Sequence, residues 1–332
     1  MTPATYDVVA IGNAIVDILS HSTDRFLAAE GMTKGSMQLI FDPAAADSLY
    51  GRMGPGQEVS GGSAANTIAG LAALGQPCAF IGQIADDQLG EVFAHDIQSL
   101  GVHFATAPAS GGEPTGRCLI LITPDGQRTM NTFLGAAQNL PQSALDAETI
   151  QAGRILYLEG YLWNAEQSRD AMKQSIALAR GAGRKVALTL SDVFVVEAHR
   201  DEFFALIDAG QIDLLFANDN EVRAMMQTDD VAAAVQALAK RVPTLVCTHG
   251  PNGAEAHSGD EHARVPAEPV AQVVDTTGAG DLFAAGFLAG QAQGHDLETS
   301  LHMGAICAAE CISHVGPRPQ ADIKALVDAR LG

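Results

Sequence analysis

Apolar and polar positions along the chain follow two different periods, which alternate many times. Short apolar runs typical of buried strands occur at residues 7–11, 79–82, 155–158, 185–190, 214–217 and 244–248. Segments with the helical period follow the earlier runs, at residues 64–74, 90–100 and 167–182. Strands that alternate with helices in this way predict an α/β fold, in which helices cover both faces of a mostly parallel sheet.

Two stretches depart from this alternation because they contain strand patterns without helices. They are residues 31–41 and 117–133, and in the second a turn at residues 124–127 separates the two strands of a hairpin. We interpret them as a small β lid inserted into the α/β body, which could exclude water from a reaction site when it closes. The predicted domains are a large α/β domain of residues 1–12, 46–103 and 136–332, and a lid of residues 13–45 and 104–135.

The charge balance excludes two classes of partner. The 332 residues include 19 Lys and Arg against 39 Asp and Glu, which gives a net charge of −20. Such a charge repels the nucleic-acid backbone and anionic membrane surfaces, so neither is an expected partner. A polyphosphate could still be bound by local features, such as helix N-termini, backbone amides, a metal ion and a few placed cations.

Cysteine usage and hydropathy indicate the compartment. The chain has five cysteines and no Cys-x-x-Cys pair, which argues against a disulfide framework and against a cysteine-rich zinc site. It begins without a basic, apolar leader, and no segment has the run of about 18 apolar residues expected of a membrane span. We therefore expect a cytoplasmic protein.

The most informative segment is residues 273–288, where a strand pattern leads through a turn of very small residues into an apolar helix. Glycines at Gly278 and Gly280 let the backbone amides converge around Ala279 without obstruction by side chains. The helix start adds its positive dipole end, so the turn is a candidate anion hole. Asp281 at the helix start is placed to accept a proton from an attacking hydroxyl group.

Other interpretations of this segment are weaker. An isolated Gly-x-Gly is more often a structural turn, with the aspartate as a helix cap. The dinucleotide-binding fingerprint would require a small residue where Phe283 stands. The chain also contains no Gly-Lys-Ser/Thr phosphate loop and no Gly-x-Ser-x-Gly nucleophile elbow. The whole string therefore favours an anion site.

This string, Asp-Thr-Thr-Gly-Ala-Gly-Asp at residues 275–281, resembles the C-terminal signature of the PfkB/ribokinase carbohydrate kinase family. Gly-Gly-Ser-Ala-Ala-Asn-Thr at residues 61–67 resembles the N-terminal signature, and the similarity extends in the right order over nearly the whole chain. The resemblance implies a ribokinase-like fold and an ATP-dependent kinase that phosphorylates a hydroxyl group. It also implies Mg²⁺ as the metal ion and leaves K⁺ as a further candidate.

The resemblance also implies a pocket for the phosphoryl acceptor. The segment at residues 12–17 matches the one whose aspartate binds substrate hydroxyls, which makes Asp17 the first expected contact. The other residues expected to line this pocket are Asn13, Gly61, Gly62 and Asn66. The alternative for each residue is a purely structural turn or helix start.

Two later motifs are implied to bind the nucleotide and the metal ion. Residues 218–221 match an Asn-x-x-Glu motif associated with Mg²⁺ and phosphate, in which Glu221 is the expected metal ligand. Residues 248–253 resemble a nucleotide-binding Thr-x-Gly-x-x-Gly stretch. The residues expected to contact the nucleotide are Asn218, Thr248, Gly250, Gly253 and Thr277. An acidic first helical turn after a strand is the alternative for the first motif.

Several passages resemble the adenosine-kinase-like branch of the family, namely residues 126–129, 188–194 and 212–218. In that branch the first passage carries an arginine that reaches the transferred phosphate, which here is Arg128. The implied acceptor is the 5′-hydroxyl of a nucleoside such as adenosine. A methionine, Met37, aligns with a polar residue that helps to hold the purine in adenosine kinases.

Three alternatives therefore stay open at the level of sequence. One is a sugar kinase of the same family, with an acceptor of the fructose or ribose type. The others are a catalytically silent nucleotide or sugar sensor and a nicotinamide-dependent oxidoreductase. An assay of ADP release with pooled nucleosides and sugars distinguishes them. A monomer and a homodimer are equally compatible with the sequence.

Overall fold

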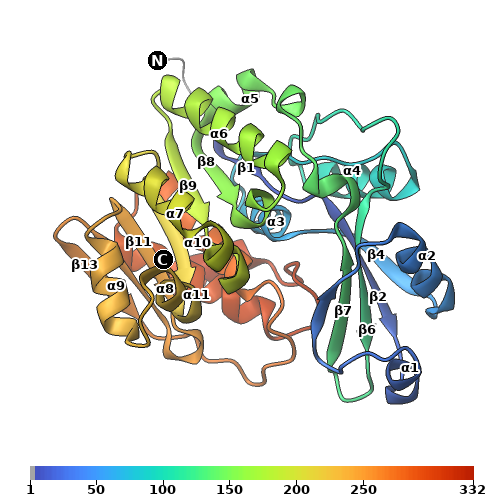
Figure 1. The fold of residues 1–332 in the computed structure, drawn as a ribbon. Coiled ribbons are helices and arrows are strands. Elements are labelled where there is room, and N and C mark those ends of the chain that lie inside the picture. Colours follow the sequence, from blue (N-terminus) through green and yellow to red (C-terminus); the bar gives the residue numbers. More distant parts are fainter. Residues whose placement is uncertain (1–3) are drawn as a thin grey trace.

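The computed structural model describes residues 4–332, which form two β-sheets with helices around them (Figure 1). The large sheet has eight strands in the order β13-β12-β11-β10-β9-β8-β1-β5. Its strands are β1 (Tyr6–Ile11), β5 (Cys78–Ile81), β8 (Gly153–Glu159), β9 (Lys185–Thr189), β10 (Leu214–Asn218), β11 (Thr244–Thr248), β12 (Ala254–Ser258) and β13 (Glu261–Val265). All neighbours from β5 to β11 are parallel, which confirms the predicted α/β class.

Helices cover both faces of this sheet, because alternate residues of its strands belong to two different apolar clusters. Val8 and Ala10 of β1 pack in one cluster, and Val9 and Ile11 pack in the other. The first face is covered by α3 (Ser63–Ala73), α4 (Gln88–Ser99), α10 (Ala279–Gln293), α11 (Leu297–Cys311) and α12 (Ile323–Leu331). The second is covered by α5 (Ala147–Ala152), α6 (Glu166–Gly181), α7 (Val193–Asp208), α8 (Asp219–Met226) and α9 (Val231–Ala239).

The small sheet lies at one side of the large one and has five strands in the order β3-β7-β6-β2-β4 (Figure 1). They are β2 (Ile15–His21), β3 (Met37–Leu39), β4 (Gly56–Gly61), β6 (Gly116–Ile122) and β7 (Arg128–Phe133), accompanied by helices α1 (Asp24–Ala29) and α2 (Pro43–Arg52). Short 3₁₀ helices occur at η1 (Gly135–Gln138), η2 (Gln142–Ala144), η3 (Gly160–Trp163) and η4 (Gly250–Asn252). The predicted hairpin is confirmed by β6 and β7, which are antiparallel.

Two details of the predicted organisation are wrong. The prediction assigned residues 46–103 to the large domain, but β4 pairs with β2 and so belongs to the small sheet. A short, glycine-rich segment such as β4 has no strong strand pattern of its own, and pairing with β2 makes it a strand. The antiparallel hairpin of β12 and β13 at the edge of the large sheet was not predicted.

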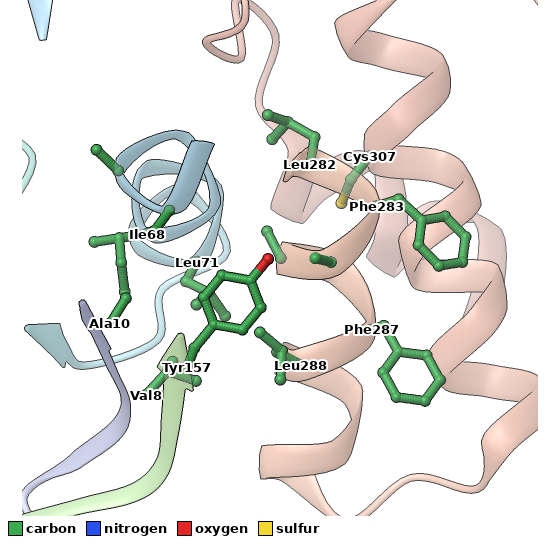
Figure 2. Close-up of a cluster of buried hydrophobic side chains, with 14 of the residues drawn as sticks. Val8, Ala10, Ile68, Leu71, Tyr157, Leu282, Phe283, Phe287, Leu288 and Cys307 are labelled. Carbon is green, nitrogen blue, oxygen red and sulfur yellow. The ribbon is translucent and has the colours of Figure 1, made fainter. Parts of the chain in front are cut away.

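Close packing between α3 and α10 fixes the relative position of the two glycine motifs, because each motif lies at the start of one of these helices. Tyr157 of β8 lies between the two helices in the core (Figure 2). At Gly70 of α3 a Cβ atom would lie 2.7 Å from atoms of Leu282 and Ala285 in α10. Glycine at this position therefore allows the helices to approach closely. Among the described residues no helix is long and apolar enough to cross a membrane.

Candidate functional site

The carboxylate of Asp281 joins the two glycine motifs. Asp281 lies in the first turn of α10, and both of its oxygens accept hydrogen bonds from α3. Ser63 Oγ donates to Oδ1 over 2.7 Å, and Asn66 Nδ2 donates to Oδ2 over 2.9 Å. The predicted base and one predicted pocket residue, Asn66, are therefore in direct contact, although they are 215 positions apart.

Asp281 is poised to take up a proton near neutral pH. Desolvation raises its pKa from 3.8 to about 6, although the hydrogen bonds from Asn66 and Ser63 and the charge of Arg318 oppose the rise. A general base works best when its pKa is close to the working pH. The raised pKa of Asp281 thus suits a group that abstracts a proton, whereas a residue that only caps a helix does not need a raised pKa.

Asp17 lies on β2 of the small sheet with only 6% of its surface exposed. Burial raises its pKa from 3.8 to about 7, the charges of Arg318 and Arg128 lower it, and the charge of Asp281 raises it further. A Cβ atom on Gly61 would lie 2.5 Å from the Asp17 carboxyl carbon, so only glycine leaves room for this side chain. The expected acceptor contact is thus buried, and its charge influences that of Asp281.

Gly62 has a structural reason to be glycine. Its φ of +103° is in the region that favours glycine, and a Cβ atom there would overlap the carbonyl oxygen of Asn13. The side-chain oxygens of Asn13 and Asn66 are buried, and neither has a hydrogen-bond partner among residues 4–332. Two unpartnered acceptors are therefore available to hydroxyl groups of a bound molecule.

The loop before α10 has the features expected of an anion hole. Gly278 has a φ of +79°, and a Cβ atom there would lie 2.5 Å from Pro317 Cβ. Asp275 supports the loop, because its two oxygens accept hydrogen bonds from the amides of Thr277 and Gly316 over 3.1 and 3.0 Å. Within the described part of the chain, the amides of Gly280 and Asp281 are not among the paired donors. Unpaired amides at a helix start can bind an anion.

Arg128 connects the small sheet to this loop. It begins β7, is 7% exposed, and places Nη1 2.8 Å from Oδ2 of Asp275. No guanidinium nitrogen of Arg128 makes a hydrogen bond of good geometry with any residue that the structure describes. The predicted arginine therefore lies beside the glycine motif and keeps donors available to an anion.

Sequence reasoning missed Glu159, the last residue of β8. Its Oε1 accepts from the backbone and side-chain nitrogens of Asn13, over 3.3 and 2.5 Å, and its Oε2 accepts from Ala64 N over 2.8 Å. Burial raises its pKa from 4.5 to about 7, against these hydrogen bonds. Glu159 thus holds Asn13 to the start of α3, and the signal for it was an acidic residue directly after a buried strand.

Arg318 was also missed, because it lies in a Gly-Pro-Arg-Pro turn that matches none of the motifs. Its guanidinium group donates to the carbonyl oxygens of Ser60 and Ala65 over 2.6 and 2.9 Å. Its charge lowers the pKa of both Asp17 and Asp281. Arg318 is therefore the cation that partly compensates the two carboxylates of the site.

A cavity of about 440 Å³ opens beside the glycine loop, within the size range of small-molecule sites. The loop residues on its wall are Thr248, Gly250, Gly253, Thr276, Ala279 and Gly280. This cavity therefore brings residues of the segment 248–253 and of the glycine loop to one wall. Thr277, which was predicted to contact the nucleotide, does not line this cavity. Its neighbour Thr276 lines the cavity instead, and the Thr277 amide donates to Asp275.

Asn218 and Glu221 form a capping box at the start of α8. Glu221 Oε2 accepts from Asn218 N over 3.0 Å, and Oε1 accepts from Asn218 Nδ2 over 2.7 Å. Burial raises the pKa of Glu221 from 4.5 to about 7, and the charge of Asp192 raises it further. Carboxylate oxygens are the ligand type that Mg²⁺ prefers, so Glu221 has the donor chemistry expected of a metal ligand, with both oxygens also accepting from Asn218. Asn218 itself serves as the helix cap.

Comparisons with known proteins agree with this geometry. The family model described as "pfkB family carbohydrate kinase" matches residues 32–324. The adenosine kinase of Saccharomyces cerevisiae is 28% identical, with 94% of this chain and 96% of that protein covered. A structure of adenosine kinase from Sinorhizobium meliloti is 44% identical, has a TM-score of 0.91 and covers 98% of this chain and 100% of that one.

A structure described as a probable sugar kinase protein from Rhizobium etli CFN 42 is 42% identical, again with a TM-score of 0.91, and covers 98% of this chain and 99% of that one. The ribokinase-like fold and the resemblance carried by the two glycine motifs are thereby confirmed. The family model spans most of the chain, and both structures agree with it. We conclude that the chain belongs to the pfkB family of carbohydrate kinases.

Proposed function

We propose that the protein transfers the γ-phosphoryl group of ATP to the 5′-hydroxyl group of a nucleoside, and that adenosine is the first acceptor to test. The observation that carries the proposal is the position of Asp281, between the hydrogen-bonding residues of α3 and the unpaired amides that begin α10. Similar proteins include adenosine kinases that align with this chain over nearly their full length, and this similarity supports a nucleoside as acceptor.

In this mechanism Asp281 accepts the proton of the attacking hydroxyl group. The amides of Gly280 and Asp281, with the helix dipole, stabilise the charge that develops on the transferred phosphoryl group. Arg128 adds a cation beside the same loop, where its free donors can contact phosphate oxygens. Mg²⁺ would neutralise charge on the phosphates when it is bound, and Glu221 would hold it, through water where needed.

The nucleotide would occupy the cavity beside the glycine loop. Its wall is mostly apolar and includes Phe283, Ala305 and Ile312 in addition to residues of the loop 248–253. Apolar walls suit the flat face of a purine, and the loop glycines let the backbone approach the ribose and phosphates closely. Position 253 must be glycine, because its φ is +92° and a Cβ atom there would overlap the carbonyl oxygen of Val265.

The pocket expected to bind the phosphoryl acceptor is lined mainly by oxygen atoms that accept hydrogen bonds. The Asp17 carboxylate and the free oxygens of Asn13 and Asn66 can each receive a hydroxyl proton. A molecule with several neighbouring hydroxyl groups therefore satisfies the pocket, as either a ribose ring or a free sugar does. A sugar acceptor is the second candidate, because one of the similar structures is described as a probable sugar kinase.

A nucleoside kinase needs a surface that contacts the nucleobase, and a sugar kinase does not, so this surface distinguishes the two candidates. Met37 and Gln38 lie on β3, and both are exposed at the edge of the small sheet. Met37 is 43% exposed, and Gln38 Nε2 donates to Asn131 Oδ1 on β7. Because side chains alternate along a strand, Met37 and Gln38 point to opposite faces of the small sheet, and the strand register places Met37 on the same face as Asp17. Met37 can therefore cover the face of a purine, which a free sugar does not need.

We expect adenosine to have the highest kcat/KM in a panel that also contains inosine, 2′-deoxyadenosine, ribose and fructose. Loss of the 2′-hydroxyl should lower kcat/KM strongly, because it leaves a buried acceptor without a partner. The assay measures ADP release for each compound. A higher kcat/KM for ribose or fructose than for every nucleoside would establish the sugar candidate, and no ADP release with any compound would contradict a kinase.

Activity should fall as the pH is lowered through the range of about 7 to 6. The pKa of Asp17 is raised to about 7 and that of Asp281 to about 6, so protonation on the acid side removes the hydroxyl acceptor and then the base. The profile of log kcat/KM against pH measures this, and its steps belong to the coupled pair. In Asp17→Asn the acid limb should move to lower pH, because the charge of Asp17 no longer opposes ionisation of Asp281. Asp42→Asn, at the exposed N-cap of α2, is the matched control.

A profile that is flat between pH 5 and pH 8 would contradict these roles. So would an acid limb that Asp17→Asn leaves unchanged.

A further inference from the structure

A cluster of histidines lies outside the proposed active site, on the hairpin of β12 and β13. Glu255 and His257 are two residues apart on β12, and His262 is the direct cross-strand neighbour of His257 on β13. Because side chains alternate along a strand, these three side chains share one face of the hairpin. The opposite face carries Ala254, Ala256 and Val265, which pack in the core that includes α11.

One oxygen atom is the centre of this cluster. His257 Nε2 lies 2.9 Å and His262 Nε2 lies 2.8 Å from the same atom, Oε2 of Glu255. The two imidazole rings are stacked, with centroids 4.2 Å apart and an interplanar angle of 17°. One ligand atom from each of the three residues falls within 4.8 Å of the other two. A short shift of these side chains would bring all three atoms to the 2.0–2.2 Å that Zn²⁺ requires.

The remaining oxygen of Glu255 is held from the other side. His249, 7% exposed at its side chain, places Nε2 2.9 Å from Glu255 Oε1, and its other ring nitrogen contacts Asp219. Glu255 therefore accepts hydrogen bonds from the rings of His257, His262 and His249. A ligating carboxylate whose second oxygen is held by another residue is an arrangement found at metal sites.

The cluster is also accessible to an ion from solution. The side chains of Glu255, His257 and His262 are 14%, 20% and 50% exposed. Arg264, opposite Glu255 on β13, is exposed and can turn its charge into solvent. Ligands that are partly exposed but held together leave a coordination position for water, as in open metal sites.

We propose that Glu255, His257 and His262 bind a first-row transition metal ion of the Zn²⁺ type, with His249 as a positioning residue behind the carboxylate. Two imidazole nitrogens and one carboxylate oxygen suit Zn²⁺, Co²⁺ or Ni²⁺, and they do not suit Mg²⁺, which prefers oxygen ligands. Each imidazole must offer a lone pair at Nε2, so its proton moves to Nδ1 or to solvent when the ion binds. None of the three ligands is a residue assigned above to the magnesium ion or to the nucleotide.

The alternative is a purely structural cluster, in which the histidines only donate hydrogen bonds to Glu255. The substitutions His257→Gln and His262→Gln distinguish a structural cluster from a metal site. Glutamine keeps an N–H donor for Glu255 but removes the nitrogen lone pair that a metal ion needs. A structural cluster therefore tolerates glutamine, whereas a metal site does not.

The test is titration of the full-length, tag-free protein with Zn²⁺ by calorimetry, in excess Mg²⁺ to occupy the oxygen-rich site. We expect one Zn²⁺ bound by the wild type, binding at least about 10-fold weaker in His262→Gln, and none at this site in the double variant His257→Gln/His262→Gln. Zn²⁺ should also raise the thermal unfolding midpoint of the wild type and not that of the double variant. Co²⁺ should show the d–d absorption of a coordinated ion only where both histidines are present.

Two controls make the test specific. His295→Gln changes an exposed histidine elsewhere and should leave Zn²⁺ binding intact. Cys247→Ala removes the thiol of a neighbouring group formed by Asp219, Cys247 and His249, and it should also leave binding intact. The proposal is overturned if the wild type binds no Zn²⁺, if the double variant binds it as tightly as the wild type, or if only Cys247→Ala abolishes binding.

Discussion

Asp281→Asn should lower kcat by about 10²–10⁴, because it removes the proton acceptor while keeping the size of the side chain. The fold should persist, since the Asn66 amide can turn its unpartnered oxygen toward the new NH₂ group. ATP binding should be nearly unchanged, as the cavity wall is formed by other residues. The measurements are kcat by ADP release and ATP affinity by calorimetry, made on the same preparation.

The same variant should be at least as stable as the wild type at pH 8. The folded-state pKa of Asp281 is raised from 3.8 to about 6, so its stabilising contribution is present at low pH and is lost as the pH rises through about 6. Removing the charge should therefore recover at most about 3 kcal/mol at pH 8. Asp296→Asn, at the exposed N-cap of α11, is the matched control and should leave activity unchanged, since asparagine caps a helix about as well as aspartate does.

A wild-type kcat in Asp281→Asn would contradict the assignment of the base. A low kcat together with a lower unfolding midpoint would instead indicate that Asp281 mainly supports the structure.

Gly280→Leu should lower kcat by about 10²–10³ without destabilising the protein. A Cβ atom on Gly280 meets no other atom within 4 Å, and Gly280 lines the cavity, so the new side chain extends into the space in front of the helix start. There it hinders the approach of phosphate to the amides of Gly280 and Asp281. Leucine also favours helix more than glycine does, by about 0.5–1 kcal/mol, so the unfolding midpoint should stay or rise.

Two comparisons make this result interpretable. Gly181→Leu introduces the same side chain at another helical glycine with open space around it, at the end of α6, and should leave kcat unchanged. Gly278→Ala should lower stability as well as activity, since φ is +79° and the new methyl group meets Pro317. Equal loss of stability in Gly280→Leu and Gly278→Ala would argue that residue 280 is constrained by the fold alone.

For several features whose information lies within one short segment, the sequence alone was sufficient. The run of residues 273–288 contains strand, turn and helix start together, so the glycine loop and the position of Asp281 follow from adjacent residues. The hairpin of β6 and β7 is predicted equally well, because its turn residues stand between two strand patterns. The alternation of periods similarly predicts the parallel sheet and the helices on both of its faces.

Where partners are distant in the chain, tertiary structure decided the outcome. Glu159 and Asn13 are separated by 146 positions, and Arg318 and Ser60 by 258, so no local pattern contains either pair. β4 is a strand because β2 lies beside it, and Thr276 rather than Thr277 lines the cavity because Asp275 holds the loop. The sequence by itself determined the fold class and the glycine loop, since period and turn chemistry act over a few residues. The raised pKa values of Asp17 and Asp281 were decided only by the packing of the helices and sheets, because desolvation depends on neighbours that folding brings together.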